Sequence, residues 1–231
     1  MKFKTFGLMA AMAATIGLSA CSDQTNSTQA ATDGVIRIAT EGAYAPFNYT
    51  NADGSLGGFD VDIANALCAK MQAECQISAQ DWDGIIPALK TGKFDAIIAA
   101  MSVTPERSEQ VDFSQPYYIN SLVFLAKKDS TFNPSDAAAI ESAKIAAQRS
   151  TISSQWLTQT YPNSQPQLYD TLDNAFMDLG NGRADAMISD KLPALTWLQS
   201  DVGQGFEIKG GDIDIDDKIA IAVDKGNSEL L

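Results

Sequence analysis

The 231-residue sequence predicts an α/β protein built from two similar lobes. One observation is an alternation of short apolar strands with helix-like segments along most of the chain. The other is an internal repeat at an offset of 90 residues, because the stretch 89–102 is echoed by 179–190 with Leu, Gly, a basic residue, Asp, Ala and Ile in register. In each copy a helix pattern runs into Gly, which can close a helix C-terminus, and a buried-type strand follows. A duplicated unit indicates two lobes, and a cleft between lobes is a favoured place for a small ligand.

The first half of the chain reads as a βαβαβ run, which predicts a largely parallel sheet covered on both faces. Its strands are expected at 35–39, 75–78 and 94–99, and its helices at 59–71 and 82–90. The first helix is expected to be amphipathic, with one stripe formed by Phe59, Ile63, Leu67 and Met71. The Gly-rich stretch 53–58 indicates a hairpin or loop before that helix.

The second half repeats this alternation. Strands are expected at 144–147, 167–169 and 184–188, and helices at 151–160, 172–181 and 192–199. The branched-rich segments 117–126 and 218–223 are candidate hinge strands, where the chain passes between the halves. Two crossings imply one lobe from 34–120 and 220–231, with a second lobe, 121–219, inserted in the middle. The end, 224–231, predicts a turn and a helix start with Asn227 or Ser228 as N-cap, so either the chain is a fragment or its closing helix is absent.

The N-terminus predicts export. Residues 1–20 combine two lysines, a short apolar run and small residues, and 18–21 form a lipoprotein-type cleavage box ending in Cys21. The alternative, a membrane anchor, is disfavoured because the apolar run is shorter than the roughly 20 residues that span a bilayer. We expect acylation of Cys21 and a polar tether over 21–33, and Ser22 at the next position is typical of sorting to the outer membrane.

Composition excludes several functions. The formal charge of −13 becomes −15 once residues 1–20, with two lysines and no acids, are removed, and such a surface repels nucleic acid. The chain has no histidine, so a histidine-based nucleophilic triad is excluded, and no phosphate-binding Gly loop is present. In an oxidising compartment Cys68 and Cys75 favour a disulfide over a metal site. We therefore expect no metal and no cofactor.

Polar groups follow the predicted strands at their C-terminal ends, where ligands bind in open α/β sheets. They include Thr40-Glu41, Ser102 with the following 104–107, Ser150-Thr151 and Ser189-Asp190.

The chain resembles the periplasmic polar amino-acid-binding proteins of ABC importers, solute-binding protein family 3. The resemblance covers residues 34–231 and rests on ordered motifs at 39–47, 58–62, 82–89, 95–98, 102–107 and 113–118. It implies the bilobed periplasmic-binding-protein fold, with two mostly parallel sheets joined by two hinge strands. The spacing of Cys68 and Cys75 is similar to that of the lysine/arginine/ornithine, histidine and arginine binders, whose disulfide falls at this place.

The resemblance implies a zwitterion site. Arg107 would clamp a ligand α-carboxylate through its planar fork of donors, whereas a solvated charge at a helix start is the alternative. Ser102 and Thr151 would add backbone N–H groups, a role compatible with helix capping. Asp190 would pair with the α-ammonium from the other lobe, although a strand-end carboxylate is more often a cap or a surface charge. Binding would then draw the lobes together.

The same resemblance places the ligand side chain. Tyr44 and Trp82 would form an aromatic box, although aromatic residues are more often core residues. Glu41 would meet a basic terminus, with an exposed capping acid as the alternative. Gln148 contacts either the ligand or the hinge. Ala100 is also expected in the site, and its position in the first copy of the repeat corresponds to that of Asp190 in the second copy.

Two departures leave the exact ligand open. Some basic-amino-acid binders carry serines where Ala99 and Ala100 stand here. Arg149 takes a place often held by Gly, and either narrows the cleft or disfavours a guanidinium nearby. The expected function is a monomeric, lipid-anchored periplasmic receptor, not an enzyme, that delivers arginine, lysine or ornithine to an ABC permease. A dehydratase-like enzyme of the same fold and an amino-acid sensor module are the alternatives.

Overall fold

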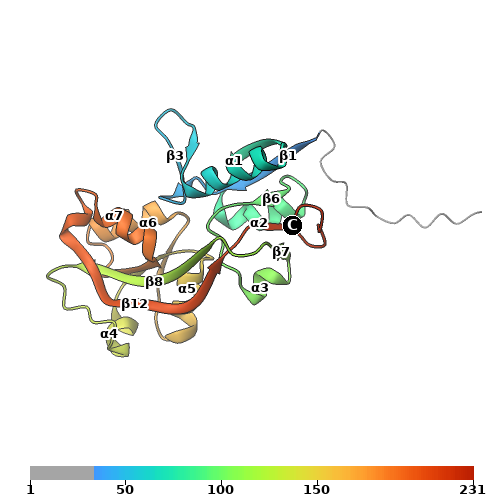
Figure 1. Cartoon of the computed structure of the whole chain (residues 1–231). Helices are drawn as coiled ribbons and strands as arrows, with labels where there is room; N and C mark the ends of the chain where they lie inside the picture. The colour runs from blue at the N-terminus through green and yellow to red at the C-terminus, as the bar shows by residue number, and fades with distance from the viewer. Residues whose placement is uncertain (1–33) are drawn as a thin grey trace, which may run out of the picture.

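The structure, a computed structural model, describes residues 34–231 (Figure 1). Its first sheet has the strand order β5-β1-β6-β13-β7. The strands are β1 (Val35–Thr40), β5 (Glu74–Ala79), β6 (Ala96–Ile97), β7 (Val111–Phe113) and β13 (Ala222–Asp224). The helices are α1 (Phe59–Met71), α2 (Trp82–Lys90) and the short α3 (Pro105–Ser108). We call the body around this sheet lobe 1, and it also contains the C-terminus (Figure 1).

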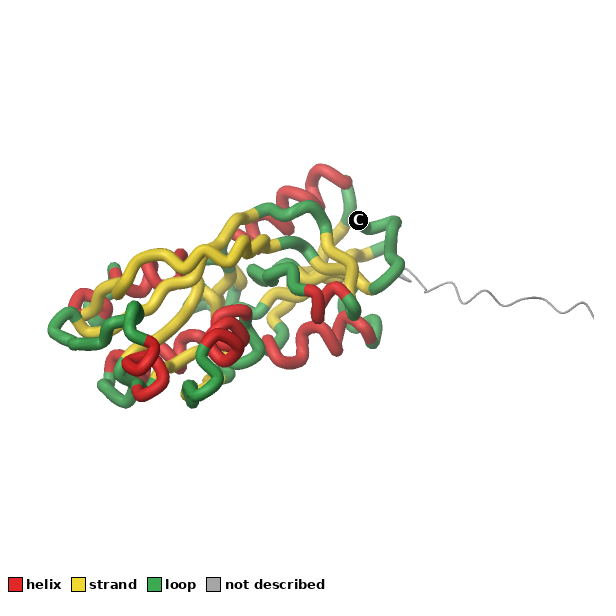
Figure 2. The backbone as a smooth tube through the Cα atoms, turned by 90° about the horizontal axis from the view of Figure 1, so that it is seen from below, coloured by secondary structure: helices red, strands yellow, loops and turns green. Residues whose placement is uncertain are grey.

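The second sheet, with the order β10-β9-β11-β8-β12, defines lobe 2. Its strands are β8 (Tyr118–Lys127), β9 (Ile145–Gln148), β10 (Gln167–Tyr169), β11 (Ala186–Asp190) and β12 (Phe206–Ile219). Its helices are α4 (Ala137–Ser142), α5 (Ile152–Thr160), α6 (Leu172–Gly180), α7 (Lys191–Leu198) and the 3₁₀ turn η1 (Gly203–Gly205). Figure 2 shows the long strands of this sheet running toward the other lobe.

A third, small sheet lies before α1. It joins β2 (Ala43–Tyr44), β3 (Asn48–Thr50) and β4 (Leu56–Gly57) in antiparallel pairs. The hairpin between β3 and β4 confirms the turn expected in 53–58. Gly58, with φ of 113°, lets the chain enter α1 where a Cβ would come within 2.5 Å of the carbonyl oxygen of Phe47.

Both main sheets are covered on two faces because successive strand residues point to opposite sides. In lobe 1, Ile38 packs with α1, whereas the next residue, Ala39, packs with α2. In lobe 2, Phe124 packs on the side of α4 and α5, and Leu125 on the side of α6 and α7. The predicted α/β architecture is therefore confirmed.

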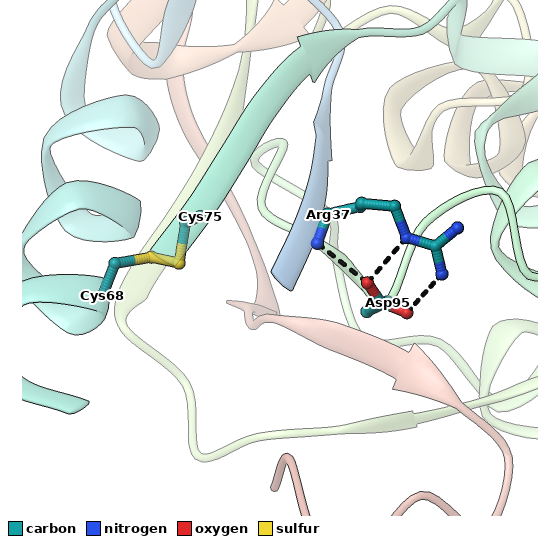
Figure 3. The surroundings of a disulfide bond; sticks show 4 residues. All are labelled: Arg37, Cys68, Cys75 and Asp95. Atoms are coloured by element: carbon teal, nitrogen blue, oxygen red, sulfur yellow. Dashed lines mark hydrogen bonds and ion pairs between the residues drawn. A yellow bond between two sulfur atoms is a disulfide. The ribbon is translucent and has the colours of Figure 1, made fainter. Parts of the chain in front are cut away.

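The repeat has the same local structure in both copies. Gly92 after α2 and Gly182 after α6 have φ of 73° and 72°. The Asp95 carboxylate accepts a hydrogen bond from the Arg37 backbone N–H at 2.8 Å, and Asp185 accepts one from the Lys144 backbone N–H at 2.9 Å. In each lobe the repeated Asp therefore accepts a backbone hydrogen bond near the start of a neighbouring strand. Figure 3 shows the Arg37–Asp95 pair.

The expectation of mostly parallel sheets is confirmed, because four of the five strands in each sheet run in the same direction. In each sheet three strands pair in parallel, and the other two pairings are antiparallel. The antiparallel pairings arise because one strand in each sheet, β13 in lobe 1 and β8 in lobe 2, runs opposite to the other four. The predicted strand 94–99 shortens to β6, and the crossing 218–223 divides between β12 and β13.

Most of the stripe predicted on α1 does not face the core, although Ile63 packs against it. Phe59, Leu67 and Met71 are 41%, 36% and 48% exposed. The buried face instead includes Asp60, Ala64 and Cys68. These positions lie one residue, or about 100° of helix rotation, from the predicted stripe. Asp60 fixes the rotation because its buried carboxylate accepts hydrogen bonds from Asn48 and Tyr117.

Residues 225–231 form turns without a helix, so the expected turn is present and the helix start at Asn227 or Ser228 does not develop into a helix. The expected signal peptide, the expected lipidation of Cys21 and the expected tether lie outside the described residues. Within 34–231, every helix is too short or too polar to cross a bilayer. The same residues contain no group of three or more side chains that could hold a metal ion.

Cys68 at the end of α1 and Cys75 in β5 form a disulfide (Figure 3). We expect the variant Cys68→Ser/Cys75→Ser to lose roughly 2–3 kcal/mol of unfolding free energy, because the crosslink limits the unfolded chain. Urea denaturation measures the loss. Reducing the unmodified protein should produce a similar loss, and equal midpoints with and without reductant would contradict the prediction.

Candidate functional site

A pocket between the two lobes brings together all nine predicted ligand residues. The residues lining it are Glu41, Tyr44, Trp82, Ala99, Ala100, Ser102, Arg107, Gln148, Thr151, Ile152 and Asp190. Ala99 and Ile152 are the lining residues that were not predicted as ligand contacts. Its open volume is about 10 Å³, the space of roughly one water, because side chains of the two lobes bond to each other across it. The described conformation is thus a closed cleft.

Arg107 follows the N-cap of α3 and is buried, with 6% exposure. Its guanidinium donates to the carbonyl oxygens of Ser102 at 2.8 Å and, across the cleft, of Ser150 at 2.9 Å. The Trp82 ring lies 5.1 Å from the guanidinium carbon, in a cation–π contact. Burial lowers the pKa of Arg107, with nearby acids acting in the opposite direction. The alternative of a solvated surface charge is therefore excluded for Arg107.

Asp190 ends β11 and is fully enclosed in lobe 2. The Tyr44 hydroxyl of lobe 1 donates to its Oδ2 at 2.7 Å. Although Asp190 stands at the N-cap of α7, it makes no side-chain cap hydrogen bond. Burial raises its pKa to about 6, and the hydrogen bond from Tyr44 opposes this shift. The carboxylate is therefore directed to the pocket rather than used as a helix cap.

Glu41 follows β1 and is 8% exposed. Its Oε1 accepts a hydrogen bond of 2.6 Å from Gln148 Nε2, which also donates to the carbonyl oxygen of Asp170. Burial raises the pKa of Glu41 to about 7, and the charges of Asp173, Asp81 and Asp83 contribute to the increase. Glu41 is thus a carboxylate held near its titration point beside the cleft.

Three further predicted residues, Thr151, Ser102 and Ala100, are held in the pocket by backbone interactions. Thr151 is the N-cap of α5, with its Oγ1 accepting from the Ser154 N–H and donating to the Gln148 carbonyl oxygen. Ser102 forms a bridge with Ile219 in the crossing segment. Ala100 has a left-handed φ of 48°, and its N–H donates to the Tyr117 hydroxyl. The capping role of Thr151 is confirmed and coexists with its place in the pocket.

The pocket offers acceptors without matching donors. Among the described residues, Asp190 Oδ1 and Gln148 Oε1 are buried and have no hydrogen-bond partner. Unpaired buried acceptors cost free energy, so they favour a ligand that brings N–H donors. The charged lining residues are two acids, Glu41 and Asp190, and one base, Arg107. A ligand with one negative and two positive groups would balance this lining.

Comparison with known proteins identifies the architecture. Residues 36–191 match the model of bacterial extracellular solute-binding proteins, family 3. The chain belongs to this family.

Two curated relatives and one solved structure illustrate its similarity. The ABC transporter arginine-binding protein 1 of Escherichia coli (strain K12) is 39% identical over 165 residues, covering 71% of this chain and 67% of that protein. The L-arginine-binding protein of Pseudomonas aeruginosa is 36% identical over 207 residues, covering 87% and 80%. An ancestral arginine-binding protein bound to arginine has a TM-score of 0.79 and 35% identity, covering 86% of this chain and 88% of that chain.

Sequence reasoning missed the buried acid between the hinge strands of this solute-binding protein. Asp217 in β12 accepts hydrogen bonds from Asn120 of β8 at 2.7 Å and from Ser102 at 3.1 Å. It therefore ties both crossing segments to a pocket residue. No local signal marks Asp217, because it stands in the acid-rich stretch 212–217, which reads as a solvated strand.

Sequence reasoning also missed a second buried group of the solute-binding protein, Tyr117 and Asp60, which hydrogen-bonds to the backbone of Ala100. Tyr117 donates to the buried Asp60 carboxylate at 2.7 Å and accepts from the Ala100 N–H. Burial raises the pKa of Asp60 to about 6. The only sequence signal for this role was the acid at the start of α1, which equally fits an exposed first-turn charge.

Proposed function

We propose that this chain is an extracytoplasmic receptor that captures a basic L-amino acid, arginine, lysine or ornithine, between its lobes. The observation that carries the proposal is the pocket lining: one buried base, two buried acids, and two unpaired acceptors that lobe 2 contributes. The names of the relatives, which include arginine-binding proteins, support the same ligand class.

The proposed contacts divide the ligand between the lobes. Arg107 of lobe 1 holds the α-carboxylate with its two-pronged donor set, assisted by the N-terminal end of α5 at Thr151. Asp190 of lobe 2 accepts from the α-ammonium. Trp82 and Tyr44 enclose the aliphatic stem, and Glu41 pairs with the terminal cation.

Ligand binding and lobe closure are coupled in this proposal. The present cross-cleft bonds, Tyr44 to Asp190 and Gln148 to Glu41, use groups that the ligand would engage. An amino acid enters when the lobes separate, replaces some of these bonds and draws the lobes together again. We infer that the closed form is what an ABC permease receives, and place the lobe boundaries near residues 120 and 220.

The pH dependence of affinity follows from Glu41. Its pKa of about 7 means that the carboxyl is largely protonated at pH 6 and ionised at pH 8. A cationic side chain favours the ionised form, so affinity for arginine should increase with pH, by up to about tenfold per unit below 7. Calorimetric titration from pH 6 to 8 checks this. In Glu41→Gln the slope should shrink to the part contributed by Asp190, and a flat profile in the unmodified protein would contradict the assignment.

A thermal-shift panel of the common amino acids tests the function. Ligand that binds the folded form raises the melting temperature, so arginine, lysine or ornithine should give the largest shifts. The absence of a shift with every amino acid, or turnover of a bound ligand into product, would defeat the receptor proposal and favour the dehydratase-like alternative.

We further propose that the receptor is exported, lipid-anchored through Cys21 and held in the periplasm. The support is the leader pattern of residues 1–21 and the extracellular family. Palmitate labelling of cells that express the full chain should mark the protein, and labelling should disappear in Cys21→Ala. An unlabelled full chain would exclude the anchor.

A further inference from the structure

One arginine outside the pocket lining spans the mouth of the cleft. Arg149 follows β9 of lobe 2, and its side chain lies between two acids. Its Nη1 lies 3.6 Å from Asp83 Oδ2 in the first turn of α2, which belongs to lobe 1. Its Nη2 forms an ion pair with Asp170, just after β10 in lobe 2. The guanidinium therefore joins the two lobes at a point separate from the pocket.

The backbone around Arg149 holds it in this position. Its N–H donates to the Tyr169 carbonyl oxygen at 2.8 Å. The next residue, Ser150, has a left-handed φ of 59°, uncommon for a non-glycine residue. The Ser150 carbonyl oxygen accepts from Trp82 Nε1 at 3.1 Å and from Arg107, both in lobe 1. Lobe 1 is thus contacted by the side chain of Arg149 and by the backbone carbonyl of Ser150.

The acids at this mouth would repel one another without the arginine. A cavity of about 500 Å³ opens beside Arg149, with Asp81 and Asp83 on the lobe 1 side and Asp170 on the lobe 2 side. Glu41 lines both this cavity and the pocket. A bridging cation offsets like charges that lobe closure brings together. Opening the lobes separates Asp83 from Arg149, whereas Asp170 stays on the same lobe as the arginine.

We propose that Arg149 is a positioning residue that latches the closed cleft through Asp83 and thereby slows release of the bound amino acid. The proposal rests on the proposed receptor function for its ligand but concerns the rate of opening rather than recognition. Because the ion pair is half exposed, its effect is expected to be moderate. Since the latch forms only on closure, it should alter dissociation much more than association.

Stopped-flow kinetics with L-arginine test the latch. Arg149→Ala should release ligand about two- to fivefold faster, with an association rate within about twofold of the unmodified protein. Arg149→Lys keeps the charge without the fork and should fall in between. Asp83→Asn should reproduce the faster release and add little to Arg149→Ala. The matched control is Arg183→Ala, which removes an exposed ion pair to Asp178 inside lobe 2.

A second readout separates the latch from the receptor function. Spin labels at Lys90→Cys in α2 and Met177→Cys in α6 report the distance between lobes by double electron–electron resonance without added ligand. Arg149→Ala should shift the distribution toward longer distances, and Arg183→Ala should not. If no basic amino acid binds, the receptor proposal fails while this distance measurement still decides the latch. Unchanged distances in Arg149→Ala, or an unchanged release rate where arginine binds, would overturn it.

Discussion

Arg107→Ala should weaken binding of L-arginine by about 100- to 1,000-fold. Truncating one member of a buried, hydrogen-bonded charge pair costs about 2–5 kcal/mol, and each 1.4 kcal/mol is tenfold in affinity. Arg107 is buried in lobe 1 and is the basic residue of the pocket lining, so the ligand carboxylate would be left without a counter-charge. Isothermal titration calorimetry measures the loss.

Two controls separate the carboxylate clamp from a general loss of structure. Arg107→Lys retains the charge but cannot form two parallel hydrogen bonds, so it should recover only part of the affinity. Agmatine, which lacks the α-carboxylate, should bind weakly to the unmodified protein and lose little further affinity in Arg107→Ala. Arginine affinity within threefold of the unmodified value in a folded Arg107→Ala would remove the clamp.

Glu41→Gln should weaken arginine, lysine and ornithine by about 10- to 100-fold while leaving a neutral ligand such as glutamine nearly unaffected. A hydrogen bond to a charged group contributes about 1.5–3 kcal/mol, and burial strengthens the effect of the missing charge. The substitution preserves shape and an acceptor oxygen, so the bond from Gln148 can persist. Competition titrations with paired basic and neutral amino acids measure the selectivity.

The matched control for Glu41 is Asp173→Asn. Asp173 raises the pKa of Glu41 through its charge, but it does not line the pocket. Its substitution should shift the pH profile of arginine binding slightly toward lower pH and leave selectivity intact. Equal losses for arginine and glutamine in Glu41→Gln would show that Glu41 acts on the whole cleft rather than on the side-chain cation.

The repeat made much of the fold and site predictable from sequence. Gly92 and Gly182 occupy corresponding positions after helices of the two repeat copies, and a strand follows each glycine. Ligands bind at the carboxyl ends of parallel strands, so the repeat also indicated Asp190 as a ligand residue. At this position the second copy differs from the first, which has Ala100. Periodicity and strand-end position are local properties, so they can be read without tertiary information.

The parts that could not be predicted depend on contacts between distant residues. Asp217 acquires its role only when β12 pairs with β8 and brings it beside Asn120 and Ser102. The rotation of α1 depends on Asp60 reaching Tyr117, 57 positions away in the chain. In both cases an acid that looks solvated in sequence is buried by partners that the local pattern does not reveal.

The central claim is that the cleft recognises a basic amino acid at three points, through Arg107, Asp190 and Glu41. Calorimetric titration of the unmodified protein at pH 8 with L-arginine tests it most directly. We predict saturable one-site binding that is much stronger than binding of either agmatine or glutamine, since each lacks one of the three charged groups. No saturable heat with L-arginine, or equal affinity for all three compounds, would contradict the account.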